Sequence, residues 1–189
     1  MIPEFFKFCA ELFPSISPYT AEGAKKAAEQ FENVSGNHLT THQNSFDCLQ
    51  GDVFSEIPFI FLDSTGEVYF KKYKAMLLSN TCDATRDDNL LFAAVRPFSE
   101  LTNNQSIIAS IKKNIKYSSL YLPDNLLIDE FVDFEMITTI PRVVFYKFHE
   151  NNDVERLITL SSVGYYMFIC KLTIFFLRPE DPETNSERY

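Results

Sequence analysis

The segment 79–88, "SNTCDATRDD", gathers polar and charged side chains directly after an apolar run that ends at Leu78. Asp83 and Arg86 could bind a phosphate or another polar ligand at the end of a strand, because charged groups form the stronger hydrogen bonds. The same composition also describes a polar turn, in which Asn80 and Asp83 bond to nearby backbone and Arg86 pairs with a carboxylate. We favour the turn and keep Asp83 and Arg86 as ligand-binding candidates.

The cysteines and histidines provide weaker candidates for catalysis or metal binding. A nucleophilic Cys82 would need a neighbouring base and a lowered pKa, and none of the three histidines is near it in the sequence, so we expect a buried thiol. His38 and His42 have the i, i+4 spacing that could hold zinc on one helix face. The segment 37–50 shows no helical period, so we expect no metal site and no cofactor.

Two groups of lysines could form one cationic strip along a groove. They are Lys71, Lys72, Lys74, Lys112, Lys113 and Lys116. Tyr69, Tyr73 and Tyr117 lie near them in the sequence, and a groove with cations and aromatic rings suits single-stranded RNA. The alternative is a solvated lysine face, which we favour because surface lysines are common.

The segment "IDEFVDFE" carries Asp129, Glu130, Asp133 and Glu135 along an expected strand. Strand alternation places Asp129 and Asp133 on the same side, with Phe131 between them. Acids in this arrangement could bind a metal or discourage pairing at a sheet edge. We favour the protection of an edge.

Composition bounds the possible functions. The chain of 189 residues has a net charge of −9, which argues against general binding of nucleic acid, because phosphates need cations. Its 46% of hydrophobic residues suffices for a core in one domain. No secretory signal is visible at the N-terminus and the cysteines form no CxxC pair, so we expect a cytoplasmic protein with free thiols.

Hydrophobic periodicity predicts helices first and then a block of strands. We expect helices over 3–13 and from Thr20 to about 34, one helix from Ser99 or Asn104 through 116, and a last helix from Ser161 or Ser162 to Arg178. The expected strands are 52–63, 67–73, 74–80, 89–98, 118–123, 127–140 and 156–160.

Four details refine this layout. Pro58 predicts a bend or a sheet edge, and the strands 67–73 and 74–80 could merge into one. The strand 127–140 is expected to break near Glu135, and the segment 141–148 fits either a strand or a helix. The order of elements predicts an α+β fold with an antiparallel sheet or small barrel.

The last helix is apolar on nearly all sides, so more than one side must be covered. The core covers one side, and a second copy of the chain could cover another. The candidates for such a dimer interface are Tyr166, Met167 and Ile174. A protein partner or a small ligand is also possible, and no membrane contact is expected.

The middle of the chain resembles the PemK/MazF-type toxins. "GDVF" at 51–54 matches their Gly-Asp-hydrophobic opening, an apolar strand ends in Ser79-Asn80, and "LLFAAV" at 90–95 follows. The resemblance covers residues 51–98 and implies an SH3-like antiparallel barrel with endoribonuclease activity. It implies that Ser79 or Thr81 acts with an arginine, yet this chain has "KKYK" at 71–74 in place of the family's Arg-Pro, so Arg86 would have to substitute.

The second half of the chain also resembles uncharacterised bacterial proteins carried by phages and other mobile elements, including integron cassettes. That resemblance implies a barrel with a closing helix and no assigned chemistry. The expected organisation is an N-terminal helical extension packed on the barrel over 1–50, the SH3-like barrel with an inserted and a C-terminal helix over 51–178, and a flexible tail over 179–189.

Three functions are compatible with these observations. The preferred one is a binding module of a mobile element that takes a ligand or a peptide in a groove of the barrel. The alternative is an endoribonuclease that uses Ser79 or Thr81, Arg86 and the lysines on single-stranded RNA. A third is an immunity or antitoxin protein, suggested by the acidic charge. Whether the chain is an enzyme stays open at this point.

Overall fold

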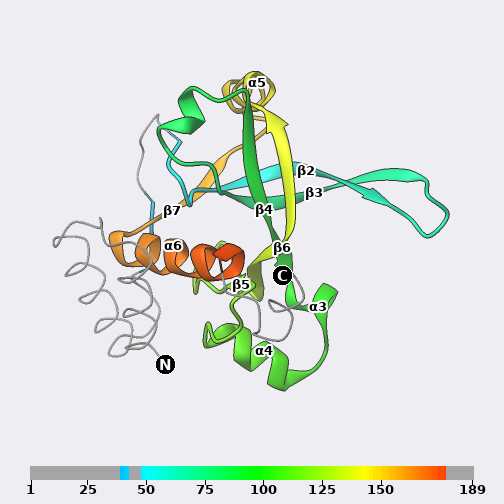
Figure 1. Cartoon of the computed structure of the whole chain (residues 1–189), viewed down its shortest axis with the longest axis vertical. Coiled ribbons are helices and arrows are strands. Elements are labelled where there is room, and N and C mark those ends of the chain that lie inside the picture. The colour runs from blue at the N-terminus through cyan, green and yellow to red at the C-terminus, as the bar shows by residue number, and fades with distance from the viewer. Residues whose placement is uncertain (1–38, 43–47, 178–189) are drawn as a thin grey trace, which may run out of the picture.

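The computed structural model describes residues 39–42 and 48–177 of the chain. Its strands form one seven-stranded antiparallel sheet in the order β1-β7-β2-β3-β4-β6-β5 (Figure 1). The strands are β1 Thr40–Thr41, β2 Val53–Leu62, β3 Val68–Leu77, β4 Asn89–Pro97, β5 Ser119–Leu120, β6 Glu130–Pro141 and β7 Arg156–Leu160. The predicted α+β class with an antiparallel sheet is confirmed. The predicted closed barrel is wrong, because β1 and β5 lie at opposite ends of an open sheet.

Four α-helices accompany the sheet in the part of the chain that is described. They are α3 Phe98–Leu101, α4 Gln105–Lys112, α5 Arg142–Glu150 and α6 Ser162–Leu177. The predicted helices at 3–13 and 20–34 and the predicted tail at 179–189 lie outside the described residues.

Each face of the sheet has its own apolar core, because neighbouring residues of a strand point to opposite faces. Val53 belongs to the core that α6 covers with Phe168, and Phe54 belongs to the core that α5 covers with Phe145. The ring of Phe54 meets that of Phe145 edge-on at 5.0 Å between centroids. The ambiguous segment 141–148 therefore forms a helix that seals one face.

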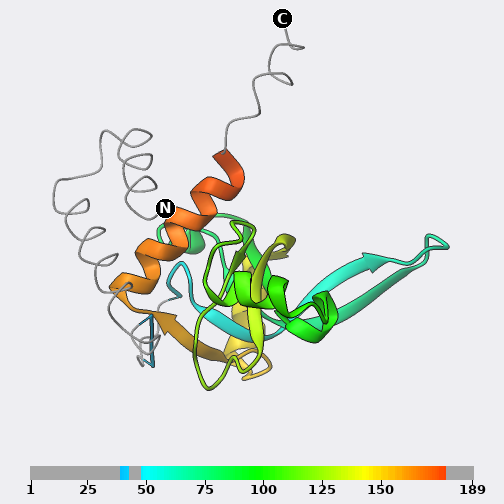
Figure 2. The same cartoon turned by 90° about the horizontal axis from the view of Figure 1, so that it is seen from below.

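The strands β2 and β3 are longer than their neighbours. Among the described residues, β7 pairs with β2 only at Val53 and Phe54, and β4 pairs with β3 only over 74–77. Beyond these points β2 and β3 pair with each other and project from the body as a two-stranded ribbon (Figures 1 and 2). We call this ribbon, residues 57–73, the β2–β3 arm.

Two sequence predictions about this region are confirmed. The runs 67–73 and 74–80 merge into the continuous strand β3, which ends at Leu77. Pro58 lies in the part of β2 that has no neighbour on its β7 side, where a missing N–H removes no ladder bond. A register shift between Phe54 and Ile57, with Glu56 at φ 56°, marks the point where the arm leaves the body.

The strand β6 carries the irregularity expected near Glu135, because its pairing with β4 shifts between Ile137 and Asp133. The predicted common side of Asp129 and Asp133 is wrong. Asp129 precedes the strand with φ 52° and its side chain is 72% exposed, whereas that of Asp133 is 4% exposed. Residues 131–134 are all buried, since β6 packs against core on both faces there.

The helix expected to run through 116 stops earlier, at Lys112. Asn114 adopts φ 54°, and its side chain accepts a hydrogen bond from Tyr121 N and donates one to Tyr121 O. This side chain ties the helix end to the strand that follows. Lys113 and Lys116 consequently lie beyond the helix rather than on its face.

Candidate functional site

Most of the lysines that the sequence analysis selected as binding candidates lie beside carboxylates. The described ion pairs are Lys71 with Glu100, Lys74 with Glu130 at 2.7 Å, Lys112 with Asp129 at 3.0 Å, Lys72 with Glu56 at 3.4 Å, and Lys116 with Glu135 at 3.8 Å. Lys113 is exposed just after α4. Exposed ion pairs add little stability, but each carboxylate cancels a charge that a phosphate backbone would otherwise meet.

Some members of the two lysine groups do come together. Lys74 donates a hydrogen bond to the carbonyl of Leu126 at 2.8 Å and contacts the carboxylate of Glu130. Lys112 contacts the carboxylate of Asp129, the residue before Glu130. The structure therefore brings Lys74 and Lys112 to the same segment, 126–130, as the groove interpretation requires. What it places between them is acidic, which the sequence argument did not anticipate.

An ion-pair network on the neighbouring surface centres on Arg96, which the sequence analysis did not select. Its Nη1 lies 2.7 Å from Oδ2 of the buried Asp133, and its Nε lies 3.7 Å from Glu100 Oε2. Tyr73 donates its hydroxyl to the same oxygen of Glu100 at 3.0 Å. Partial burial raises the pKa of Glu100, but the Lys71 ammonium and the Tyr73 hydroxyl outweigh it, so the pKa lies below its ordinary value.

The two hydroxyls expected to act in catalysis are engaged by backbone. Ser79 Oγ accepts a hydrogen bond from Leu91 N at 2.9 Å, and Thr81 Oγ1 accepts one from Gln50 N at 3.0 Å. The first bond connects the loop 79–88 to β4, and the second connects it to the turn that precedes β2. They give Ser79 and Thr81 a structural role that does not depend on a substrate.

The rest of this loop follows the turn interpretation. Asn80 accepts a hydrogen bond from Cys82 N through its side chain, and Asp83 opens a 3-10 turn over Asp83–Thr85. Arg86 follows the turn and is exposed. The prediction of a buried Cys82 is wrong: its side chain is exposed, because Ala84 is the residue of the turn that packs into the core.

Arg86 and the lysines lie at opposite ends of β4. The loop 79–88 precedes the first residue of this strand, and α3 and α4 follow its last residue (Figure 1). A nine-residue strand spans about 30 Å. The loop and the segment around Lys112 therefore do not form one site.

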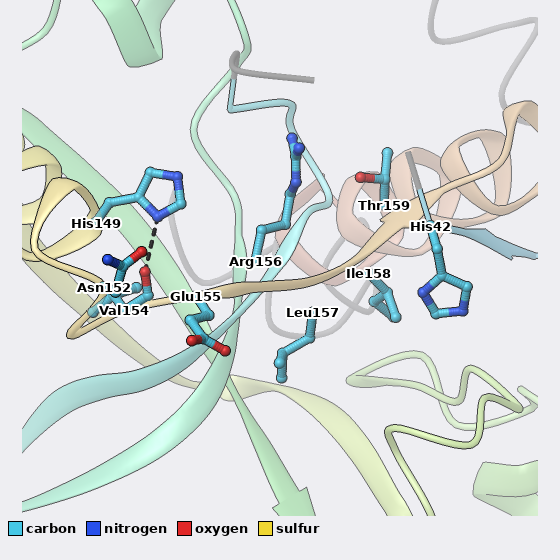
Figure 3. Close-up of a pocket in the computed structure, with 9 residues that line it drawn as sticks. All are labelled: His42, His149, Asn152, Val154, Glu155, Arg156, Leu157, Ile158 and Thr159. Carbon is cyan, nitrogen blue, oxygen red and sulfur yellow. Dashed lines mark hydrogen bonds between the residues drawn. The ribbon is translucent and has the colours of Figure 1, made fainter. Parts of the chain in front are cut away.

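A cavity of about 350 Å³ lies beside β7 (Figure 3). It is lined by His42, His149, Asn152, Val154, Glu155, Arg156, Leu157, Ile158 and Thr159. His149 Nδ1 lies 2.8 Å from the carbonyl of Val154, so this nitrogen carries a proton and donates it. Glu155 directly precedes β7, and its side chain and that of Arg156 point in opposite directions in Figure 3. These side chains do not converge on one point.

Next to this cavity, a buried ion pair connects the start of β2 to β7. The carboxylate of Asp52 is fully buried; its Oδ2 accepts from Leu49 N at 2.9 Å and lies 3.3 Å from Arg156 Nη1. Burial raises the pKa of Asp52, although these partners act in the other direction. Asp52 belongs to the Gly-Asp motif of the toxin resemblance. In this structure its carboxylate connects the start of β2 to β7 through Arg156.

Four of the exposed large apolar side chains lie together on the β2–β3 arm. Ile60, Leu62, Val68 and Phe70 are each 69–74% exposed. Ile60 is directly opposite Phe70 and Leu62 is directly opposite Val68, so all four point to one face of the ribbon. We call this surface the outer face of the arm.

The other face of the arm is aromatic and partly covered. The rings of Phe61 and Tyr69 stack with 5.3 Å between centroids, and Phe59 meets Tyr73 edge-on at 5.6 Å. The ammonium of Lys71 lies 4.6 Å from the centre of the Tyr73 ring. These contacts support the arm from one side and leave its outer face uncovered by any described residue.

The proposed dimer residues of α6 are half-buried. Tyr166, Met167 and Ile174 all have intermediate exposure, and Met167 packs against the core that Phe168 fills. Over residues 164–177 of this helix, only the end, at Phe176 and Leu177, is exposed. Within the described chain α6 thus has less apolar surface to offer than the sequence suggested, and its role in a dimer stays a prediction.

Two features are absent from the described residues. No helix there combines the length and apolar character needed to span a bilayer, and no group of three histidine, cysteine or acidic side chains is placed to hold a metal ion. His38 of the proposed zinc pair lies outside the described residues, and His42 lies 3.7 Å from Asp124.

Comparisons with known protein families, with curated proteins and with solved structures found no match to this chain.

The sequence analysis did not predict the arm, although the apolar residues that form it are evident in the sequence. The segment 57–70 contains eight large apolar residues around one turn, more than a strand with one buried face needs. The sequence does not show how far β7 and β4 pair along β2 and β3. Only the pairing of β4 and β7 shows that half of each long strand stands outside the sheet.

Proposed function

We propose that the chain is a protein-interaction module without catalytic activity, and that the β2–β3 arm is its binding element. The observation that carries this proposal is the outer face of the arm, where four large apolar side chains are each at least 69% exposed. Contiguous exposed apolar surface on a globular protein is typical of a contact with another molecule. The arm replaces the barrel groove of our sequence-based hypothesis, since the sheet is open.

The construction of the arm supports the same proposal. An isolated two-stranded hairpin is only marginally stable in water and gains stability by packing on another layer. Both strands of the arm also have unpaired backbone edges among the described residues. A ribbon with an apolar face and free edges is a site to which another polypeptide binds readily.

The endoribonuclease remains the alternative, with less support. Ser79 and Thr81 have their hydroxyls engaged by backbone amides, Arg86 lies at the other end of β4 from α4, and the lysines are paired with acids. Incubation with mixed RNA tests it directly. Selective cleavage that Arg86→Ala abolishes would replace our proposal with this alternative.

The setting of the protein is also a proposal. The resemblance to proteins of mobile elements suggests an accessory protein whose partner is encoded by the element or by its bacterial host. The acidic net charge of −9 would favour a basic partner, as an immunity protein has.

Site-specific photo-crosslinking tests the proposal. A photoreactive amino acid would replace Phe70 on the outer face, with Ile128 as the matched control because it is 71% exposed and lies outside the arm. We expect cross-linked adducts from position 70, in bacterial cells or with the purified chain, and none from position 128. The absence of adducts from position 70, or equal adducts from both positions, would contradict a binding role of the arm.

A further inference from the structure

We infer that the outer face of the β2–β3 arm binds the same face of a second copy, with the two arms antiparallel about a two-fold axis. This inference rests on the proposed function and names the partner of the same surface. It differs from the helix-mediated dimer of the sequence analysis, in which the contact residues lie on α6.

The first argument is that the outer face can contact itself. A two-fold interface places one patch against an identical patch, so the patch must be compatible with its own copy. The cross-strand pairs Ile60–Phe70 and Leu62–Val68 are adjacent and contain no charged or polar side chain. Two such faces can exclude water between them without leaving any side-chain polar group unpaired.

The second argument is the order of charges along the arm. Asp63 and Glu67 flank the turn at its tip, and Lys72 lies on the outer face at its base, opposite Pro58. In an antiparallel pair of arms, the acidic tip of one copy lies beside Lys72 of the other copy. A parallel pair would place like charges together, so charge complementarity selects the antiparallel arrangement.

The groups that provide these charges are available to a second copy. Lys72 lies 3.4 Å from Glu56, but both side chains are more than half exposed, so this pair is weak and can be exchanged. The acidic tip is held in place because Asp63 Oδ1 accepts hydrogen bonds from Thr65 N at 2.8 Å and from Glu67 N at 2.9 Å. The tip is therefore an ordered element with a defined charge.

The third argument concerns the direction of approach. Strand addition at the β2 edge would need the N–H that Pro58 lacks, and the register shift at Glu56 twists this edge away from a regular ladder. Packing of one ribbon face on another meets neither obstacle. Strand addition at the β3 edge, which is free of described partners over 68–73, would leave the outer face exposed, so we infer contact between faces rather than extension of the sheet.

Sedimentation velocity of the full chain over a wide range of concentrations tests the inference. We expect a dimer that grows with concentration, and we expect the double variant Ile60→Ser/Phe70→Ser to weaken dimerisation by about tenfold or more. The matched controls are Ile128→Ser and Val143→Ser, which remove equally exposed apolar side chains outside the arm. Both controls should dimerise like the unmodified chain.

A charge exchange tests the antiparallel arrangement itself. Lys72→Glu alone and Glu67→Lys alone should each weaken the homodimer, because each places like charges together at both ends of the interface. A mixture of the two variants should form a heterodimer, since every tip–base contact then joins opposite charges. A structural defect in either variant could not be repaired by mixing. A mixture that dimerises no better than its components would overturn the antiparallel pairing.

Two other results would overturn the inference alone. One is a chain that stays monomeric at all concentrations while Phe70 cross-links to a different protein in cells, which leaves the proposed function intact. The other is a dimer that Ile174→Ser disrupts and the arm variants do not, which assigns the interface to α6. The absence of both self-association and cross-linking would overturn the inference and the proposed function together.

Discussion

Lys171, in the middle of the most apolar of the described helices, donates a hydrogen bond to the carbonyl of Ser119 on β5 at 2.6 Å. The same amine donates to the carbonyl of Lys116 at 2.6 Å, and the residue is 7% exposed. Burial lowers the pKa of Lys171 from 10.5 to about 7, whereas the two carbonyl acceptors favour the charged form. One polar group thus ties α6 to the edge strand of the sheet.

The first prediction concerns the pH dependence of stability through Lys171. The pKa is near 7 in the folded state and near 10.5 when unfolded, so between these values the unfolded chain binds more protons and stability rises with pH. Relative to Lys171→Met, which does not titrate, the unfolding free energy of the unmodified chain should rise by about 2 kcal/mol from about pH 7 to about pH 9.

Urea denaturation of both proteins at the two pH values provides the measurement, and the Met variant controls for every other group that titrates. A constant difference between the two proteins would show that the carbonyl bonds keep Lys171 protonated throughout.

The second prediction concerns Asp52 and Arg156. Asp52→Asn preserves shape but removes the negative charge that lies 3.3 Å from the guanidinium of Arg156, whose side chain is 14% exposed. Breaking a buried ion pair by removing one charge costs about 3 kcal/mol or more. We expect that loss in the unfolding free energy, and we expect Asp52→Asn combined with Arg156→Met to cost less than the sum of the single changes.

The coupling is read from a double-mutant cycle measured by denaturation. Additive effects of the two substitutions would mean that Asp52 and Arg156 contribute independently. In that case the contact between β2 and β7 depends on their backbone pairing instead.

The third prediction uses glycines with different surroundings. A Cβ on Gly164, near the start of α6, would lie 2.0 Å from the carbonyl oxygen of Leu39, which is backbone and cannot turn away. Replacing glycine by alanine inside a helix normally stabilises it by about 0.5–1 kcal/mol. Here we expect the opposite sign, with Gly164→Ala costing about 2 kcal/mol or more.

Gly66→Ala is the matched control, because a Cβ at Gly66 meets no atom within 4 Å and only its φ of +87° opposes the change. Its cost should stay near 1 kcal/mol. A stabilised Gly164→Ala protein in thermal unfolding would show that α6 does not rest on the backbone at Leu39.

Particular residues show how far the sequence determines this fold. The alternation that places Val53 and Phe54 on opposite faces, and the edge position of Pro58, follow from local chemistry and were predictable. The closure of the sheet was not, because it depends on whether two strands distant in sequence meet. The two end strands, β1 and β5, have only two residues each; β5 lies within the expected strand 118–123, but no local pattern shows whether such short strands meet.

The candidate site was predictable to a smaller extent. Lysine positions are evident in the sequence, but their pairing with acids such as Glu100 and Asp129 depends on three-dimensional proximity. The same holds for Arg96 and Asp133, which are 37 residues apart in the chain. Residue types therefore predict where the lysines lie in the chain, and only the fold shows that most of them lie beside acids.

The last prediction separates binding from folding on the arm. Phe70 and Ile60 are 74% and 73% exposed, so replacing either by serine removes little buried area and mainly weakens a cross-strand pair, at a cost of about 0.2–1 kcal/mol. Phe168→Ala removes a ring with no exposed surface from the core and should cost about 3–5 kcal/mol. Thermal unfolding at a concentration where the chain is monomeric measures both. If Phe70→Ser destabilised the monomer as much as Phe168→Ala, the outer face would belong to the core of the fold, and the loss of association in the arm variants would reflect unfolding.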